Sequence, residues 1–299
     1  MMPVYRPPAG YFRQALESVL LQDPGPDRME ITVVDDASPD GEVGALVQAI
    51  AGDRVAYVRN PHNLGLAACW NECIRLARGR WIHLLHQDDY VFPGFYETLE
   101  QAARAHPEVN LLAARTHYVD GQGATIGYSD RLPELESGGH DVHAFFYTTP
   151  IQCPGVAIQK SFFARHGGFR TDMSFVLDCE MWARAIHLGG GLVRPEVLSA
   201  YRINEGNVSS RLARTAADLA DYDRLHRLFT RRYHGFDAQR ARDLIIAKAQ
   251  KREREFAQKG DPAAALANRK FWRRQLSMAE HLARFLKKFM GSRPPEYKP

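Results

Sequence analysis

The chain has 299 residues, a formal net charge of +4, and a composition that is 45% hydrophobic and 25% charged. These values are typical of a soluble globular protein with room for one large domain and an appendage. The sequence has no run of 18 or more apolar residues, and its first ten residues lack the basic and apolar regions of a secretory signal. We therefore expect a cytoplasmic protein and exclude a membrane-spanning one.

The charge is divided unevenly along the chain. Residues 211–299 contain 22 Lys and Arg against 10 Asp and Glu, a balance of +12, whereas residues 1–210 contain 17 basic against 25 acidic residues, a balance of −8. We therefore predict an acidic globular domain over residues 1–210 and a basic helical extension over residues 211–299.

The four cysteines are Cys69, Cys73, Cys153 and Cys179. None of them forms a C-x-x-C pair, which disfavours a zinc site or a redox motif. We predict buried, reduced thiols.

The first part of the chain alternates helix and strand patterns. Residues 12–20 carry apolar side chains at helical spacing, and residues 31–34 form the short β-branched run of a buried strand. Residues 43–50 predict a helix with one apolar face, for which Ser38 is a suitable N-cap and Pro39 a suitable first position.

The alternation continues with strand patterns over residues 55–58 and 81–85, helix patterns over about 66–77 and 94–105, and an apolar run over 111–114. Strands that alternate with helices imply an α/β fold, in which helices cover both faces of a mainly parallel sheet.

Residues 115–170 are rich in Gly, Pro and Asp and predict long loops, with a strand near 155–158 and a short helix near 161–166. From about residue 213 the pattern is helical and rich in Arg, Lys and Ala.

Two of the predicted strands end in adjacent aspartates, at Asp35-Asp36 and at Asp88-Asp89. In open α/β sheets, ligands bind at the carboxyl ends of the strands. Four carboxylates at one edge repel one another unless a divalent cation and hydroxyl groups compensate them. The alternative is that each pair serves only a turn or a helix N-cap.

The sequence lacks three common motifs of α/β enzymes. There is no G-x-G-x-x-G after a strand and no G-x-x-x-x-G-K-[ST], which disfavours dinucleotide oxidoreductases and P-loop enzymes. The G-x-S-x-G of α/β-hydrolases is also missing.

Five blocks over roughly residues 3–210 resemble those of family 2 glycosyltransferases, in the order and spacing of that family. The blocks are Val33-Val34-Asp35-Asp36-Ala37-Ser38; Asn63-Leu64-Gly65 with Asn71 and Ala77-Arg78-Gly79-Arg80-Trp81-Ile82; His86-Gln87-Asp88-Asp89; Gly167-Gly168-Phe169; and Asp178-Cys179-Glu180-Met181-Trp182-Ala183-Arg184. The resemblance implies a GT-A-like fold, a Rossmann-type three-layer sandwich with a mainly parallel sheet, followed by the α-helical C-terminal extension.

The resemblance also implies an activity. Such enzymes move a sugar from a nucleotide-diphosphate sugar to an acceptor hydroxyl, usually with inversion at the anomeric carbon and with Mg²⁺ or Mn²⁺ as cofactor. A saccharide or lipid-linked acceptor in cell-surface polysaccharide or glycolipid synthesis would fit, and nucleic acid is not an expected partner.

The family's motifs assign roles to individual residues. The residues implied in nucleotide-sugar binding are Pro3, Tyr5, Asp35, Asp36, Asn63, Gly65, Asp88 and Arg202. Asp89, together with Asp88, would bind the metal ion, and Asp178 would be the general base. Arg202 could reach the diphosphate or form a surface salt bridge.

Two alternatives to the Asp178 assignment are open. Glu180 is the rival for the base, although the family places the base first in the acidic-x-acidic pair. Asp178 could instead cap its helix, because Asp suits N-caps. We expect Arg184 to be structural and to pair with an acidic neighbour.

Three interpretations of residues 211–299 compete: a solvated helical appendage, peripheral attachment to anionic lipid, and nucleic-acid binding as the least favoured. Membrane contact would use an apolar stripe of Leu276, Ala279, Leu282, Leu286 and Phe289, with Arg284, Lys287 and Lys288 beside it.

Two other functions are weighed against glycosyl transfer. A catalytically inactive nucleotide-sugar-binding or scaffold protein is one, because only Met1 to Tyr5 stand where the family has a full first strand, and His86 stands where it often has aspartate. A nucleotidyltransferase is the other, but the Gly/Arg/Lys-rich phosphate loop expected near its N-terminus is not present.

Overall fold

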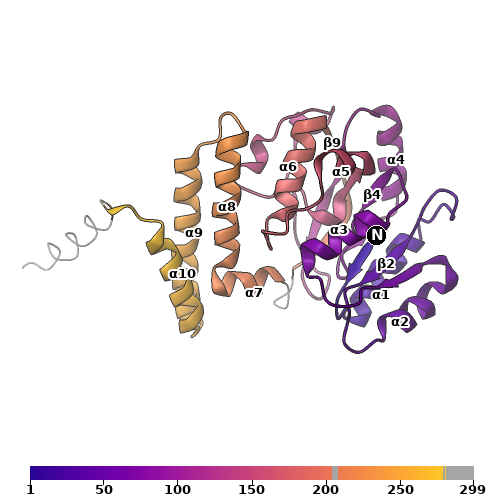
Figure 1. Cartoon of the computed structure of the whole chain (residues 1–299), viewed down its shortest axis with the longest axis horizontal. Coiled ribbons are helices and arrows are strands. Elements are labelled where there is room, and N and C mark those ends of the chain that lie inside the picture. Colours follow the sequence, from indigo (N-terminus) through magenta and orange to yellow (C-terminus); the bar gives the residue numbers. More distant parts are fainter. Residues whose placement is uncertain (204–207, 279, 281–299) are drawn as a thin grey trace, which may run out of the picture. The chain divides into compact units, whose positions relative to one another are not determined.

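A computed structural model describes residues 1–203, 208–278 and 280 of the chain. The chain divides into two compact units, Met1–Asn207 and Val208–Pro299. The first unit is an α/β domain, and the second contains only helices among its described elements (Figure 1).

The regular elements of the first unit alternate between strands and helices over most of its length. In chain order they are β1 (Met2–Val4), α1 (Ala9–Leu20), β2 (Thr32–Asp35), α2 (Val43–Ala51), β3 (Ala56–Arg59), α3 (Leu66–Leu76), β4 (Trp81–His83), β5 (Tyr90–Val91), α4 (Phe95–Ala105), β6 (Leu111–Val119), β7 (Thr125–Tyr128), β8 (Val156–Gln159), α5 (Lys160–His166), α6 (Leu177–Gly189) and β9 (Gly191–Arg202).

The first three strands form the parallel sheet that the alternation predicts. β1 lies beside β2 with Val4 opposite Asp35, and β2 lies beside β3 with Asp35 opposite Arg59. The Met1 amino group donates to the His83 carbonyl (3.0 Å), and the Leu85 N–H donates to the Met1 carbonyl (3.1 Å). These two bonds connect β1 to the segment that begins with β4, so the hydrogen-bonded ladder passes from one sheet to the other.

The second sheet has the order β4-β8-β6-β9-β5, with β7 beside β6, and here the mainly parallel arrangement does not hold. Only β6 and β9 are parallel, whereas β4–β8, β6–β8, β5–β9 and β6–β7 are antiparallel. A parallel pair needs a crossover connection, and α6 provides one before β9. The short turn between β6 and β7 permits only an antiparallel hairpin.

Helices cover both faces of the strands and form three layers. On one face, alternate residues such as Met2, Val4, Leu112 and Ala114 join a single apolar cluster with α1, α2 and α4. On the other face α3 contacts β1, α5 contacts β8, and α6 contacts β6 and β9. Because strand side chains alternate between faces, the residue between Met2 and Val4 and the residue between Leu112 and Ala114 point toward this second layer of helices.

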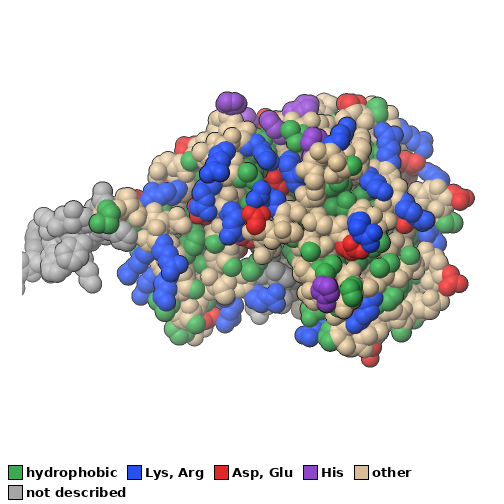
Figure 2. Space-filling model, in the orientation of Figure 1, with side chains coloured by type: hydrophobic (Ala, Val, Ile, Leu, Met, Phe, Trp, Pro, Cys, Tyr) green, Lys and Arg blue, Asp and Glu red, His purple; other side chains and the backbone are tan. Residues whose placement is uncertain are grey.

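The second unit contains α7 (Val208–Thr215), α8 (Ala217–Arg232), α9 (Ala238–Gln258) and α10 (Pro262–Arg274). A small apolar cluster that includes Leu219, Ala249 and Trp272 joins α8, α9 and α10, and buried Asp218 pairs with Arg252 on α9 at 2.7 Å. Many Lys and Arg side chains lie on the visible surface of this unit (Figure 2).

The predicted membrane-contacting stripe lies almost entirely outside the described residues, since only Leu276 falls within them. Over the part of the chain that the structure describes, no helix combines the length and the apolar character needed to cross a bilayer. All four cysteines are free and buried, as predicted.

Gly155 provides a test of how the segment before β8 packs against β6 and β9. A Cβ atom at this position would lie 2.6 Å from the Ala114 carbonyl oxygen and 3.0 Å from Ser199 Oγ. We expect Gly155→Ala to destabilise the protein by about 1–3 kcal/mol, the usual cost of overpacking, seen as a lower thermal midpoint. Gly10→Ala is the control, because its Cβ would meet nothing within 4 Å. Equal midpoints for the two variants would contradict this packing.

Candidate functional site

The carboxyl ends of β1, β2 and β3 lie at one edge of the sheet, and the loop after β4 joins them there. The Tyr5 N–H donates to Gln87 Oε1 (2.8 Å), and Gln87 Nε2 donates to the Tyr5 carbonyl (3.2 Å). This reciprocal pair ties residues 84–89 to the end of β1. The two acidic pairs, at 35–36 and 88–89, therefore lie at the same edge.

The Asp35 carboxylate is fully buried and has partners on both oxygens. Oδ1 accepts from the Ser38 N–H (2.9 Å), and Oδ2 accepts from the Tyr57 hydroxyl and from Arg59 Nη1, both at 2.7 Å. Burial acts to raise the pKa of Asp35, but the hydrogen bonds from Ser38 and Tyr57 and the charge of Arg59 outweigh it and lower the pKa. Asp35 is therefore a stable buried anion.

Ser38 does not cap a helix, contrary to the prediction. Its Oγ accepts from the Arg6 N–H (2.9 Å), and α2 begins only at Val43, after Glu42 at the N-cap. Because the Ser38 Oγ accepts from Arg6 and its N–H donates to Asp35, this residue closes the turn after β2 instead of starting a helix.

Asp36 organises the loop between β3 and α3. Its Oδ1 accepts from Asn60 Nδ2 and the Leu64 N–H, both at 2.8 Å, and its Oδ2 accepts from the Gly65 N–H (2.9 Å). Asn63 Nδ2 donates to the Asp36 carbonyl (3.0 Å). Gly65 has a φ of +80°, a conformation that favours glycine. The motif residues 36, 63 and 65 thus form one hydrogen-bonded unit.

Pro3 on β1 and Tyr5 just after it, both predicted to bind the nucleotide, differ in exposure. Pro3 is buried within the sheet opposite Val34, and its contact with a nucleotide stays a prediction. Tyr5 is 41% exposed at the carboxyl edge, with the Arg6 guanidinium 5.3 Å from its ring centre.

His86, Asp88 and Asp89 form a cluster in which one potential ligand atom of each lies within 4.8 Å of the others. Asp89 is 1% exposed, and its Oδ1 accepts from the Arg202 N–H (2.9 Å). Its Oδ2 has no hydrogen-bond partner within the described structure and lies 3.5 Å from His86 Nδ1.

Electrostatics in this cluster favour a cation. Burial, followed by the charge of Asp89, raises the pKa of Asp88 to about 6. Burial lowers the pKa of His86, but Cys153 and Asp89 raise it overall, so a metal ion bound by this imidazole would take the place of its proton. A buried carboxylate oxygen without a donor, beside a second carboxylate whose charge is disfavoured, suits a divalent ion. The residues present therefore fit a metal ion at this position.

Arg202 was predicted to reach the donor diphosphate or to form a surface salt bridge, and in this structure its side chain binds protein groups. A contact with the donor stays a prediction. The Arg202 guanidinium is buried and donates to the Asp88 carbonyl (3.0 Å), to the carbonyls of Asp120 and Gly121, and to Gln14 Oε1 (2.7 Å). It also lies 4.3 Å from the centre of the Tyr11 ring. These contacts make Arg202 a structural link between β9, α1 and the acidic loop.

Asp178 lies in the first turn of α6 and is partly exposed to solvent. Val176 occupies the N-cap, so Asp178 is not the capping residue, and its Oδ1 accepts from the Cys179 N–H (2.7 Å). Burial raises the pKa of Asp178 to about 6, although that N–H and the charge of His86 act to lower it. Such a carboxyl is ionised at neutral pH and still basic enough to take a proton.

Asp178 and the metal-binding cluster lie in one neighbourhood. The His86 charge acts on both Asp89 and Asp178. The buried Cys153 thiol, whose pKa is raised mainly by burial, interacts with His86, Asp178 and Asp89. The Trp70 ring packs against His86, with ring centres 4.9 Å apart. Cys153 and Trp70 were not among the predicted site residues, because no local sequence pattern connects them to the acidic motifs.

Glu180, the rival for the base, is structural. It is 1% exposed, and both of its oxygens accept from Arg184 at 3.0–3.2 Å. Arg184 also donates to the carbonyls of His166, Gly167 and Gly168. The expected structural role of Arg184 is confirmed, and its partner is Glu180.

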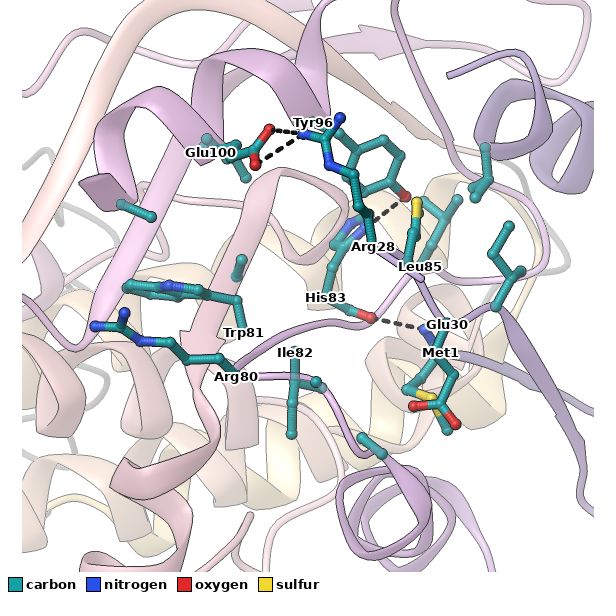
Figure 3. Close-up of a pocket in the computed structure, with 18 of the residues that line it drawn as sticks. Met1, Arg28, Glu30, Arg80, Trp81, Ile82, His83, Leu85, Tyr96 and Glu100 are labelled. Carbon is teal, nitrogen blue, oxygen red and sulfur yellow. Dashed lines mark hydrogen bonds and ion pairs between the residues drawn. The ribbon is translucent and has the colours of Figure 1, made fainter. Parts of the chain in front are cut away.

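A cavity of about 320 Å³ lies at the amino ends of β1 and β4, the opposite edge from the acidic cluster (Figure 3). His83 lies at its wall, with its ring nitrogens near the Tyr96 hydroxyl and the Pro154 carbonyl, each at 3.1 Å. Burial lowers the pKa of His83 to about 3, so its ring is neutral. None of the predicted site residues lines this cavity.

The Glu180–Arg184 pair can be tested by mutation. We expect Glu180→Ala to cost about 3–5 kcal/mol of stability, because it leaves the Arg184 charge buried without its partner. Glu17→Ala is the control, since Glu17 pairs with Arg13 at the same helical spacing but both are about half exposed, and we expect less than about 1 kcal/mol there. Urea denaturation measures both, and similar losses would argue against a structural role for Glu180.

Comparison with known proteins identifies relatives over most of the chain. Residues 1–167 match the model of glycosyl transferase family 2. The succinoglycan biosynthesis protein ExoO of Rhizobium meliloti (strain 1021) is 31% identical over 93% of this chain and 84% of that protein. The uncharacterized glycosyltransferase MJ1057 of Methanocaldococcus jannaschii is 23% identical over 71% of this chain and 73% of its own length.

Solved structures share the fold at low sequence identity. S. aureus TarS 1-349 in complex with UDP-GlcNAc has a TM-score of 0.58 and 15% identity, over 93% of this chain and 91% of that one. The mannosyltransferase PcManGT from Pyrobaculum calidifontis in complex with GDP-Man and Mn²⁺ has a TM-score of 0.55 and 16% identity, over 98% and 80%. The predicted GT-A-like α/β fold with a helical C-terminal region is confirmed.

The family match covers more than half of the chain, and the ExoO alignment extends over nearly all of it. This chain belongs to glycosyl transferase family 2 and is a glycosyltransferase.

Proposed function

We propose that the chain is an inverting, metal-dependent enzyme that transfers a sugar from a nucleotide-diphosphate sugar to an acceptor hydroxyl in cell-surface polysaccharide synthesis. One observation carries the proposal: the buried Asp89 Oδ2 has no hydrogen-bond partner in the described part of the chain, and the charges of Asp89 and Asp178 both act on the Cys153 thiol. Relatives named for succinoglycan and minor teichoic acid biosynthesis support the substrate class.

Asp88 and Asp89 would hold Mg²⁺ or Mn²⁺ beside the donor diphosphate. Bound there, the ion would stabilise the negative charge that develops on the departing nucleotide diphosphate. The relative PcManGT was solved with GDP-Man and Mn²⁺, which agrees with this role. The buried backbone link from Arg202 to Asp89 fixes one carboxylate oxygen and leaves the other for the ion.

Asp178 would act as the general base. The acceptor hydroxyl loses its proton to the Asp178 carboxylate while its oxygen bonds to the anomeric carbon, and the bond from that carbon to the diphosphate breaks with its electron pair leaving on the diphosphate. Attack from the side opposite the leaving group inverts the anomeric configuration. Asp178 on α6 and Asp89 after β4 come from different segments, as this geometry requires.

The nucleotide would bind at the carboxyl edge beside Tyr5. Because Asp35 and Asp36 are saturated by protein donors, we propose that they act mainly by holding the surrounding loops in place. Asn63 and Gly65 belong to the same hydrogen-bonded loop. Direct contacts from these residues to the nucleotide stay a prediction of the sequence.

The base assignment predicts a specific kinetic defect. We expect Asp178→Asn to lower kcat by about 100-fold or more, the usual contribution of a general base, while donor affinity stays within about threefold. Asp53→Asn, an exposed change outside the site, is the control. Nucleotide diphosphate release in the presence of acceptor measures the rate. Full turnover by Asp178→Asn would remove Asp178 from the mechanism, and no release by the unaltered protein would favour the inactive-binder alternative.

The metal assignment predicts a binding defect instead. We expect Asp89→Ala to abolish the increase in thermal midpoint that a nucleotide-diphosphate sugar produces with Mn²⁺, because Asp89 would hold the ion that compensates the charge of the diphosphate. Chelation of metal by EDTA should have the same effect on the unaltered protein. A panel of UDP-, GDP- and dTDP-sugars identifies the donor in the same assay. Donor-induced stabilisation that survives both treatments would contradict metal dependence.

A further inference from the structure

We infer that His86 is a nitrogen ligand of the cation held by Asp88 and Asp89, and that it biases this site toward transition-metal ions over Mg²⁺. The inference rests on the proposed function, because it concerns the cation of that same site. The inference goes beyond the proposed function because it states which ions the site prefers.

The cluster has dimensions that suit one ion. Ligand atoms lie about 2.0–2.1 Å from a small divalent ion, so two of them are separated by up to about 4.2 Å. The chosen atoms of His86, Asp88 and Asp89 lie within 4.8 Å of one another, and His86 Nδ1 is 3.5 Å from Asp89 Oδ2. Small rotations of these side chains bring all three to a common ion.

An unsatisfied polar atom inside the cluster points to a ligand. Asp89 is 99% buried, yet its Oδ2 has no hydrogen-bond partner among the residues described. Leaving a buried polar atom without a partner costs about 1–3 kcal/mol. An ion that takes an electron pair from the Asp89 oxygen and from the imidazole offsets part of this cost.

Packing holds the imidazole ring beside the two carboxylates. The Trp70 ring lies against it at 4.9 Å between ring centres, with an interplanar angle of 32°. Trp70 in turn contacts Phe169 edge-on at 4.9 Å. A ring that is fixed by aromatic neighbours is already placed to bind metal and loses little conformational freedom when it does.

Ligand chemistry determines the preference. Mg²⁺ takes oxygen ligands and releases its waters reluctantly, whereas imidazole suits transition metals, whose affinity for a given site rises from Mn²⁺ to Co²⁺. A site of two carboxylates and one imidazole therefore favours Co²⁺ and Mn²⁺ over Mg²⁺ more strongly than a site of carboxylates alone.

Calorimetric titration of the full chain with Co²⁺, Mn²⁺ or Mg²⁺ tests this preference. We expect the unaltered protein to bind Co²⁺ at least tenfold more tightly than Mg²⁺, and His86→Asp, which replaces nitrogen by oxygen, to reduce that ratio at least tenfold. His106→Asn is the control, because His106 contacts Glu108 at the surface and should keep the ratio of the unaltered protein. An unchanged ratio in His86→Asp would overturn the inference.

Pulsed EPR of bound Mn²⁺ tests the ligand directly, because a lack of nitrogen coupling in the unaltered protein is decisive without any variant. A histidine nitrogen coupling in the unaltered protein that disappears in His86→Asp supports the inference. Mn²⁺ bound without nitrogen coupling overturns it and leaves the proposed function intact, since His86 would then only pair with Asp89. If none of the three ions binds and the donor still does, the metal dependence in the proposed function fails as well.

Discussion

Buried negative charge at the carboxyl edge of the sheet is the constraint on which the rest of this structure depends. The protein treats its carboxylates in two ways. Asp35 and Asp36 receive hydrogen bonds on both oxygens from neighbouring loops and side chains. Among the residues that the structure describes, Asp89 receives a protein donor on one oxygen only. Asp35 and Asp36 therefore hold the loops at this edge in place, whereas Asp89 keeps one oxygen that can bind an ion.

Whether a charged side chain already has protein hydrogen-bond partners also distinguishes structural from chemical roles elsewhere in the domain. Glu180 and Arg202 are charged, buried and close to the site, but the polar atoms of each form hydrogen bonds with protein partners. Asp178, two residues before Glu180, accepts from one adjacent N–H and is partly exposed. Asp178 and Glu180 both carry a carboxylate, so residue type alone does not distinguish them. The helix distinguishes them, because Glu180 faces Arg184 one turn later, whereas Asp178 lies in the first turn and is partly exposed.

The sequence could predict what local patterns encode. The apolar runs and the acidic residues that end them located β2, β4 and the acidic loops, and the family motifs located Asp178. It did not predict β7, which lies in the Gly- and Asp-rich region expected to form loops. The strand near 155–158 was predicted, but not its antiparallel pairing with β4 and β6, because that pairing depends on contacts between distant segments. The same holds for Cys153, which reaches the site from a loop 64 residues after Asp89, and for Ser38, whose turn depends on Arg6.

The charges at this site set function against stability. The pKa values of Asp88 and Asp178 are raised from 3.8 to about 6, so each binds its proton more tightly in the folded chain than in the unfolded one. Their contribution to stability is therefore present below about pH 3.8 and is lost as the pH rises through about 6. At neutral pH both carboxylates oppose folding, yet both must be ionised for metal binding and proton transfer. A cation that binds only the folded state offsets this loss of stability by mass action. The same ionised carboxylates that make this edge reactive are therefore the ones that a bound ion stabilises.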